Sequence, residues 1–200
     1  AEFKRLERDF FIRDTNTVAR ELIGNYLVRK TPKGHIIGKI IEVEAYLGPI
    51  DKASHSYNYK RTNRTKPMYM KPGTLYIYLI YGLYYCLNVI TEPAGIPCAI
   101  LIRKLFPIEG IELMVENRNV KVGKNFKNLT DGPGKLCMAL NITKAKFNGK
   151  DSCLTSSKLF FIEGEKISSN SIIANKRIGI GYAEEDKDRL LRFTLKNEIR

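Results

Sequence analysis

Two glutamates, Glu42 and Glu44, lie close together in the apolar segment IIEVEAY. In a β-strand, residues two apart point to the same face, so both carboxylates would face one side of a sheet. Carboxylates flanked by apolar residues cost free energy unless they meet a partner, a metal or a substrate. The chain then runs through Tyr46, Asp51 and His55, and acid, phenol and imidazole groups together are the components of a small catalytic pocket. A strand with one solvated face would give the same pattern, so this alternative stays open.

A run of tyrosines follows in LYIYLIYGLYYCLN (75–88), a pattern that predicts strand, turn and strand. If an odd number of residues connects the strands, such as 81–83, Tyr78 and Asn88 point into the same space, whereas a two-residue turn separates them. The corresponding cross-strand pairs are Tyr76 with Asn88 and Tyr78 with Cys86. A tyrosine-rich strand pair explains most of these residues. It does not explain Tyr81 at the tip, where a turn pushes the ring into water.

The chain has a strong excess of positive charge. Its 200 residues include 34 Lys and Arg against 21 Asp and Glu, a net charge of +13. Such an excess attracts polyanions, nucleic acid first and an anionic membrane second, although lysine-rich surfaces also serve solubility alone. Two segments carry no acidic residue: YKRTNRTKPMYMK (59–71), which includes Lys60 and Arg64, and NRNVKVGKNFKN (117–128). Their Asn, Gly and Pro content predicts exposed loops that can follow a phosphate backbone.

Other features of the sequence set limits on the class of protein. No apolar stretch is long enough to cross a membrane, and the first residues lack the apolar core of a secretory signal. The four cysteines show no CxxC spacing, and there are only two histidines. This argues against a structural zinc site and for reduced thiols in a cytosol-like compartment.

The elements that position these residues follow from the hydrophobic pattern. Asp14 can cap a helix that has Val18 and Leu22 on one face and ends at Gly24. The other expected elements are two strands within 25–46 joined at 32–34, a hairpin at 74–90, helices at 108–117 (with Ile108, Ile111 and Met114 on one face) and after 132–134, and short strands near 158–162, 176–182 and 191–196. This irregular order predicts an α+β fold. We expect a single domain over residues 1–200, with a mixed, largely antiparallel curved sheet, flanking helices and a protruding β-hairpin.

Five segments keep the order and spacing of one known family: EVEAYLGPIDKASHS, MYMKPGTLYIYLIYGLYYCLN, AILIRKLFPIEGIELM, DGPGKLCMALNI and KRIGIGY. With them the chain resembles the alkyladenine (3-methyladenine) DNA glycosylase family, over roughly Phe10 to Phe193. The resemblance implies a monomer that excises alkylated or deaminated purines from duplex DNA without a metal or redox cofactor. Its substrates would be of the 3-methyladenine, 7-methylguanine, hypoxanthine and ethenoadenine type. It also implies base excision repair, in the cytoplasm at the nucleoid of a prokaryote or in the nucleus of a eukaryote.

The resemblance also assigns roles to residues at matching positions. Glu44 matches the carboxylate that activates water to attack C1′ of the flipped nucleotide, and Arg103 matches the arginine near that water and the nucleotide's phosphate. The residues that match the pocket around the extruded base are Tyr46, His55 and Tyr78, with Asn88 as the amide that crowds a guanine 2-amino group. The residues that match contacts to nucleic acid are Tyr81, which fills the gap left by the base, Leu83 on the same turn, and Lys60 and Arg64 on the basic loop.

The chemistry of such substrates agrees with these residue types. A 3- or 7-alkylated purine is cationic, so aromatic faces attract it by about 0.5–2 kcal/mol, and its charge makes it a good leaving group. Base flipping costs roughly a few kcal/mol, and an inserted side chain offsets part of that cost.

Three alternatives come from other classes of protein. One is a nucleic-acid-binding module in which Glu44 is structural and the tyrosines stack on bases, but it leaves Glu44, Tyr46 and His55 in one stretch unexplained. The second is a bifunctional glycosylase-lyase with a lysine nucleophile. The third and least favoured is a metal nuclease, whose activity would vanish with a chelator.

Overall fold

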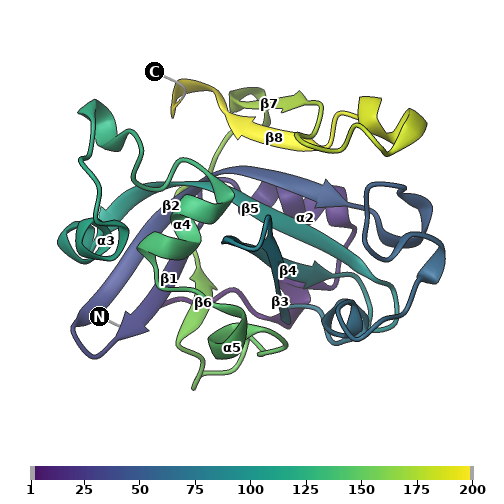
Figure 1. Cartoon of the computed structure of the whole chain (residues 1–200), viewed down its shortest axis with the longest axis horizontal. Helices are drawn as coiled ribbons and strands as arrows, with labels where there is room; N and C mark the ends of the chain where they lie inside the picture. The colour runs from purple at the N-terminus through teal and green to yellow at the C-terminus, as the bar shows by residue number, and fades with distance from the viewer. Residues whose placement is uncertain (1–2, 199–200) are drawn as a thin grey trace.

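Eight strands form one sheet in the computed structural model of the chain, which describes residues 3–198 (Figure 1). The strands are β1 (Tyr26–Thr31), β2 (Gly34–Tyr46), β3 (Leu75–Ile80), β4 (Tyr84–Thr91), β5 (Cys98–Glu109), β6 (Leu159–Ile162), β7 (Ile172–Asn175) and β8 (Arg192–Leu195). The order across the sheet is β3-β4-β5-β2-β1-β6, and β8 pairs with both β2 and β7. Each of these pairings is antiparallel, so the predicted α+β class with a largely antiparallel sheet is confirmed.

Helices cover the sheet from more than one side. They are α1 (Arg8–Phe11), α2 (Thr15–Leu22), α3 (Ile111–Arg118), α4 (Pro133–Ala139) and α5 (Lys144–Phe147). Helix α2 packs against β2 and β5, α4 against β4 and β5, and α5 against β3. Figure 1 shows α4 in front of the strands and α2 behind them. Because helices lie on both sides, residues 36–45 of β2 are buried throughout, which explains the long apolar run of that strand.

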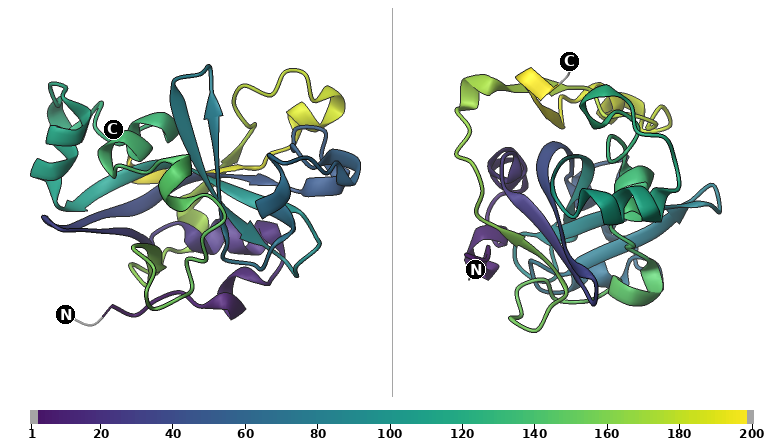
Figure 2. Two further views of the ribbon diagram at one scale, coloured as in Figure 1. Left: turned by 60° about the horizontal axis from the view of Figure 1, so that its bottom comes forward. Right: turned by 90° about the vertical axis from the view of Figure 1, so that its left-hand side faces the viewer.

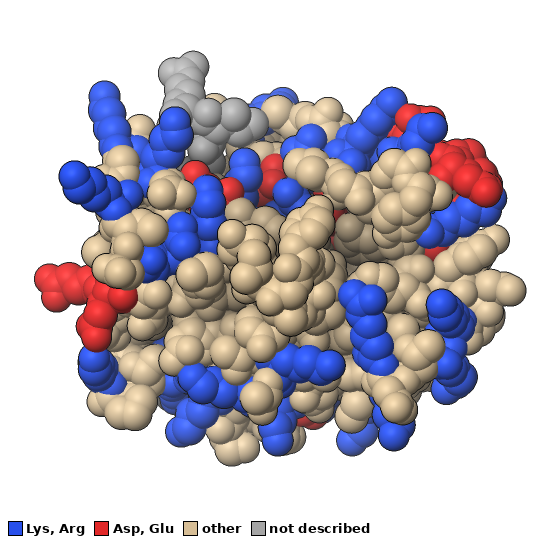
Figure 3. Space-filling view, viewed as in Figure 1, with Lys and Arg blue, Asp and Glu red and all other residues tan. Residues whose placement is uncertain are grey.

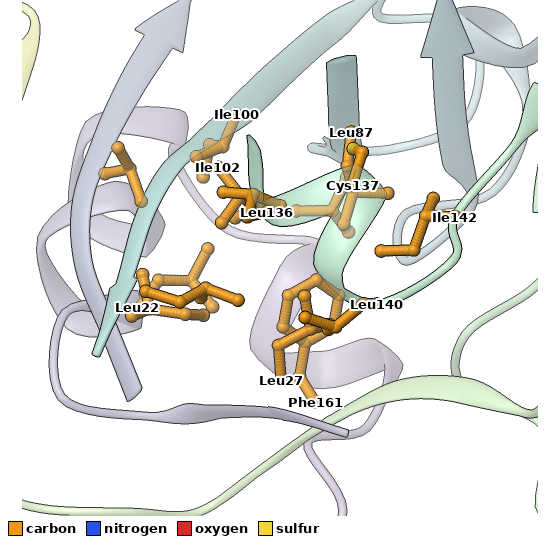
Figure 4. Close-up of a cluster of buried hydrophobic side chains, with 14 of the residues drawn as sticks. Leu22, Leu27, Leu87, Ile100, Ile102, Leu136, Cys137, Leu140, Ile142 and Phe161 are labelled. Atoms are coloured by element: carbon orange, nitrogen blue, oxygen red, sulfur yellow. The ribbon is translucent and has the colours of Figure 1, made fainter. Parts of the chain in front are cut away.

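A large apolar core lies between the sheet and the helices. Figure 4 shows side chains from distant parts of the chain that meet there: Leu22 of α2, Leu27 of β1, Ile100 of β5, Leu136 of α4 and Phe161 of β6. The N-terminus of α2 forms as its sequence predicts, since the Asp14 carboxylate accepts a hydrogen bond from the backbone N–H of Thr17 at 3.0 Å. The helix then buries Val18, Ala19 and Leu22.

The tyrosine-rich hairpin of β3 and β4 has the predicted three-residue connection, 81–83. Tyr76 pairs with Asn88 and Tyr78 with Cys86, which confirms the odd-numbered alternative. Tyr81 has a left-handed backbone with φ of 51°, and its side chain is 87% exposed. Figure 2 (left) shows the hairpin rising above the rest of the molecule.

Two expectations for secondary structure are wrong. Ile108 belongs to the end of β5 and not to the following helix, because Gly110 adopts a left-handed conformation with φ of 73° and separates the two elements. A Cβ at Gly110 would lie 2.4 Å from the carbonyl oxygen of His35, so only glycine fits this close approach. Residues 176–182 form no strand. The strand in this region is β7, and the segment after it makes side-chain contacts in place of a ladder.

Candidate active site

Glu44 is fully buried, and both of its carboxylate oxygens have hydrogen-bond donors. The hydroxyl of Tyr46 donates to Oε1 at 2.9 Å, and Nη1 of Arg103 donates to the same oxygen at 3.4 Å. The backbone N–H of Ile178 donates to Oε2 at 2.7 Å. These donors come from β2, from β5 and from the segment between β7 and β8, so tertiary packing sets the direction of the carboxylate.

Glu42 lies on the same face of β2 and is also buried. Its carboxylate accepts hydrogen bonds from Thr194 Oγ1 at 2.7 Å, Arg192 Nη1 at 3.1 Å and Arg103 Nε at 3.2 Å. Arg103 therefore bridges the two carboxylates. The relative exposure of Glu42 is 1% and that of Glu44 is 0%, which excludes a solvated face for this part of the strand.

The two carboxylates have pKa values shifted in opposite directions. Burial raises the pKa of Glu44, and the charge of Arg103, the Ile178 N–H and the Tyr46 hydroxyl only partly offset it. Burial also acts to raise the pKa of Glu42, but the hydrogen bond from Thr194 and the nearby cations outweigh it, so its pKa is lowered. Neighbouring carboxylates with separated pKa values are a common sign of different roles. Glu44 is thus the stronger base of the two carboxylates.

Tyr46 lies between Glu44 and a small cavity, since its hydroxyl binds the Glu44 carboxylate and its side chain lines the cavity. The cavity has a volume of about 20 Å³ and is lined by Tyr46, Ala53, Ser54, His55, Met68, Tyr76, Tyr78, Asn88 and Ala99. The structure therefore brings together the four residues predicted to form a pocket, Tyr46, His55, Tyr78 and Asn88. A cavity of this size holds about one water molecule, which is far smaller than a purine.

Aromatic rings and one imidazole form the walls of this cavity. The Nδ1 atom of His55 and the hydroxyl of Tyr76 are hydrogen-bonded at 2.9 Å, and Asn88 Nδ2 donates to the Tyr76 carbonyl at 3.2 Å. The rings of His55 and Tyr78 meet edge to face with centroids 4.7 Å apart. Burial lowers the pKa of His55 to about 4, so that the imidazole is neutral at pH 7. It can contribute a hydrogen bond to a ligand but not a positive charge.

The basic loop 57–67 lies next to the cavity, because it connects His55 to Met68 and both residues line the cavity. Arg64 and Lys60 are exposed on this loop, and the Arg64 guanidinium lies 5.2 Å from the centroid of the Tyr78 ring. The charges of both residues also help to lower the pKa of His55, after burial.

The predicted contacts at the hairpin tip lie apart from the cavity. Tyr81 and Leu83 are 87% and 71% exposed, and neither lines the cavity. Figure 3 shows Lys and Arg side chains around a largely uncharged centre on the face seen in Figure 1. A surface of this kind is favourable for an extended polyanion.

The sequence did not reveal how three groups hold the carboxylate of Glu44 and the turn beside it. These are the backbone N–H of Ile178, Arg177 beside it, and the carboxylate of Asp51, which forms a buried ion pair with Arg177. The alternating residues of KRIGIGY indicated a strand, so the pattern gave no sign that the backbone there serves Glu44. Asp51 was expected in a pocket, but its carboxylate is enclosed at 0% exposure.

Within residues 3–198, no group of three His, Cys, Asp or Glu side chains is arranged to hold a metal ion. In the same part of the chain, no helix has the length and apolar character that a membrane span requires.

A basic chain with one buried carboxylate joined to an aromatic cavity has the features of an enzyme that acts on the bases of nucleic acids. The comparison with protein families defines this class further, since residues 9–199 match the family model of methylpurine-DNA glycosylase. Curated relatives named "Putative 3-methyladenine DNA glycosylase" include those of Clostridium perfringens strain 13 (48% identity, 96% of each chain), Clostridium novyi strain NT (47%, 97% of this chain and 96% of the relative) and Alkaliphilus oremlandii (46%, 96% of each). The chain therefore belongs to the methylpurine-DNA glycosylase family. The predicted enzyme class, a DNA glycosylase of alkylation repair, is confirmed.

Proposed function

We propose that the chain hydrolyses the N-glycosidic bond of alkylated or deaminated purines in duplex DNA, with Glu44 as the group that activates water. The observation that carries this proposal is the environment of Glu44. Its carboxylate is buried, its pKa is raised, and Tyr46 connects it to an aromatic cavity. A buried carboxylate held by three donors keeps a fixed direction, which a general base requires.

In the proposed reaction, Glu44 accepts a proton from a water molecule as its oxygen attacks C1′ of the flipped nucleotide. The electron pair of the N-glycosidic bond leaves with the base. A 3- or 7-alkylated purine leaves without further help because it is already cationic, whereas hypoxanthine needs a proton. Arg103, at 3.4 Å from Glu44, orients the carboxylate and offers positive charge to the nucleotide's phosphate.

Base flipping explains the aromatic residue at the tip of the hairpin. A base inside the duplex cannot reach a buried carboxylate, so the nucleotide must leave the stack at a cost of roughly a few kcal/mol. The exposed Tyr81, with Leu83 beside it, enters the minor groove and occupies the gap. Lys60 and Arg64, exposed on the loop beside the cavity, neutralise phosphates of the same DNA.

The cavity must widen when it takes up the base. Its volume of about 20 Å³ leaves no room for a purine among Tyr46, His55 and Tyr78. Loop 57–67 beside the cavity is the part that moves in this proposal, because it carries no strand and its exposed cations can turn toward the phosphates of DNA. The separated rings then stack on the base, and Asn88 crowds a guanine 2-amino group.

The replacement Glu44→Gln tests the proposed base. We expect that lesion-duplex binding persists while single-turnover base release falls by about 10²–10⁴-fold, the usual contribution of a general base. Glu42→Gln is the matched control, because it alters another buried carboxylate on the same strand. We expect it to slow release far less. Unchanged release by Glu44→Gln would refute the assigned role.

The substrates and the alternatives are tested with the same assay. DNA containing 3-methyladenine, 7-methylguanine, hypoxanthine or ethenoadenine is incubated with the protein, and the released base is identified. Trapping of the protein on DNA by borohydride would favour a glycosylase-lyase, whereas an intact abasic strand favours attack by water. Binding without any release would favour a module that only binds nucleic acid.

A single domain over residues 1–200, a monomeric state and a location at the bacterial nucleoid remain predictions. Light scattering of the purified chain, alone and with lesion duplex, measures the monomeric state directly.

A further inference from the structure

Arg177 and Asp51 form an ion pair that is closed off from solvent. Arg177 Nη1 lies 2.5 Å from Asp51 Oδ2, and Nη2 lies 2.9 Å from Oδ1, so both carboxylate oxygens face the guanidinium. The side chains of both residues have a relative exposure of 0%. The Nε atom of Arg177 is buried without a hydrogen-bond partner. Such a pair is a weak source of stability, because the cost of removing two charges from water offsets most of their attraction.

Each member of the pair fixes a different irregular segment. Asp51 accepts hydrogen bonds from the backbone N–H groups of Leu47 and Ala53, which shapes the turn between Tyr46 and His55. Arg177 donates to the carbonyl oxygens of Ala45 at 3.1 Å and Asp186 at 3.2 Å. The segment after β7 is therefore fastened to the end of β2 by side-chain bonds, in addition to the backbone bond from Ala45 N–H to the Leu191 carbonyl and the pairing of β8 with β2.

The ion pair adjoins two groups that donate hydrogen bonds to Glu44: the backbone N–H of Ile178 and the hydroxyl of Tyr46. Ile178, the residue after Arg177, donates its backbone N–H to Glu44 Oε2 at 2.7 Å. The guanidinium of Arg177 also lies 4.8 Å from the centroid of the Tyr46 ring, and the hydroxyl of that ring donates to Glu44 Oε1. One buried pair thus holds a donor to each oxygen of the same carboxylate.

We propose that Arg177 and Asp51 are positioning residues for base release, which hold the Ile178 N–H and the Tyr46 phenol against Glu44. This inference rests on the proposed role of Glu44 as the base. The positioning role explains why an ion pair occupies a place where apolar side chains would pack at a lower cost in free energy. The planar guanidinium donates hydrogen bonds to the Ala45 and Asp186 carbonyls and to Asp51 at the same time. Asp51 also neutralises Arg177, so that no unpaired cation stands behind a ring proposed to stack on a cationic base.

The pair also affects the proton affinity of Glu44. The titratable and charged groups around Glu44 are Glu42 and Tyr46 on β2, Arg103 on β5, Tyr78 on β3, Cys86 on β4, Arg192 on β8, and Arg177 and Tyr182 on the segment after β7. The charge of Arg177 and the N–H of Ile178 both lower the pKa of Glu44, against the larger effect of burial. Loss of the pair therefore raises the pKa of Glu44 further and moves the acid side of the pH–rate profile to higher pH.

The experiment removes both charges at once, with the double variant Arg177→Met and Asp51→Asn. Replacing both partners leaves no unpaired buried charge, so the stability cost is small compared with that of either single variant. We expect a folded protein with a lesion-duplex affinity near that of the wild type and a lower thermal midpoint, because the carbonyl oxygens of Ala45 and Asp186 lose a donor. We expect single-turnover base release to be about tenfold to a hundredfold slower, the range for loss of oriented hydrogen bonds to a charged group, with the acid side of the profile at higher pH.

Arg29→Met is the matched control. Arg29 is also buried, donates to the carbonyl oxygen of Leu140 at 3.1 Å and lies 4.7 Å from the centroid of the Phe147 ring, but it has no contact with Glu44 or its donors. We expect its loss to lower the thermal midpoint without moving the pH–rate profile.

The outcomes separate the two proposals. Release within about threefold of the wild-type rate and an unmoved profile for the double variant, while Glu44→Gln is inactive, would overturn the positioning role alone. Full activity of Glu44→Gln would overturn the proposed function, and the positioning role with it. If the double variant does not fold, Arg177→Lys serves as the test, because lysine keeps the positive charge but lacks the planar, two-pronged guanidinium. A folded Arg177→Lys protein with slow base release would support the proposal, and one that releases the base at the wild-type rate would overturn it.

Discussion

Tyr81 combines a strained backbone with an exposed ring, and the replacement Tyr81→Asn separates the two. A tyrosine with φ of 51° occupies the left-handed region, which costs most L-residues about 1–2 kcal/mol. Asparagine enters this region more readily. The ring is 87% exposed, so its removal takes almost no packing from the protein. We therefore expect the variant to be more stable, by about 1 kcal/mol, which corresponds to roughly 2–4 °C in Tm for a chain of this size.

The same change should weaken the complex with damaged DNA. Full burial of a large apolar side chain contributes about 1.5–3 kcal/mol, and in the proposed complex the ring of Tyr81 moves from water into the base stack. Binding of a lesion duplex should therefore fall by about tenfold to a hundredfold. No charge is removed, so the dependence of affinity on salt should stay the same.

Thermal unfolding and lesion-duplex binding by fluorescence anisotropy measure the two effects, and single-stranded DNA with the same lesion is the control substrate. The single strand has no stack to fill, so its processing should change little. An equal loss on single-stranded and duplex DNA would refute the insertion of Tyr81. A lower Tm would refute the strain argument, independently of DNA.

Two further predictions concern charge. His55 has a pKa lowered to about 4 from an ordinary value of 6.5, chiefly by burial, so between these values the unfolded chain binds a proton that the folded chain excludes. The contribution of His55 to the free energy of unfolding should then decrease as the pH falls from 6.5 to 4, by up to about 3 kcal/mol. Urea unfolding across this range checks it, because wild type and His55→Gln should differ in pH dependence by this amount. Lys60→Ala and Arg64→Ala should each make the plot of log affinity against log salt concentration less steep by about one unit of slope, for undamaged and damaged duplex alike. An unchanged slope would contradict a phosphate contact.

Much of the sheet could be predicted because the information is local. The strand pair of β1 and β2, the cap at Asp14 and the tyrosine hairpin each lie within about twenty consecutive residues, and the structure confirms them. The alternation in 176–182 has the same appearance but does not form a strand. Its N–H at Ile178 binds the carboxylate of Glu44, and such a choice between a ladder and a distant side chain cannot be read from a short pattern.

The candidate site shows the same division. The sequence by itself determined which chemical groups are present and in which order: two carboxylates on one face of a strand, a phenol and an imidazole after them, an aromatic residue on a tight turn, and an excess of cations to attract a polyanion. Only the tertiary structure decided that the pKa values of Glu42 and Glu44 move apart, and that Asp51 meets Arg177, more than a hundred residues away. The reason is physical: burial and the approach of distant donors set both properties, and both depend on how β2, β5 and the segment after β7 pack together.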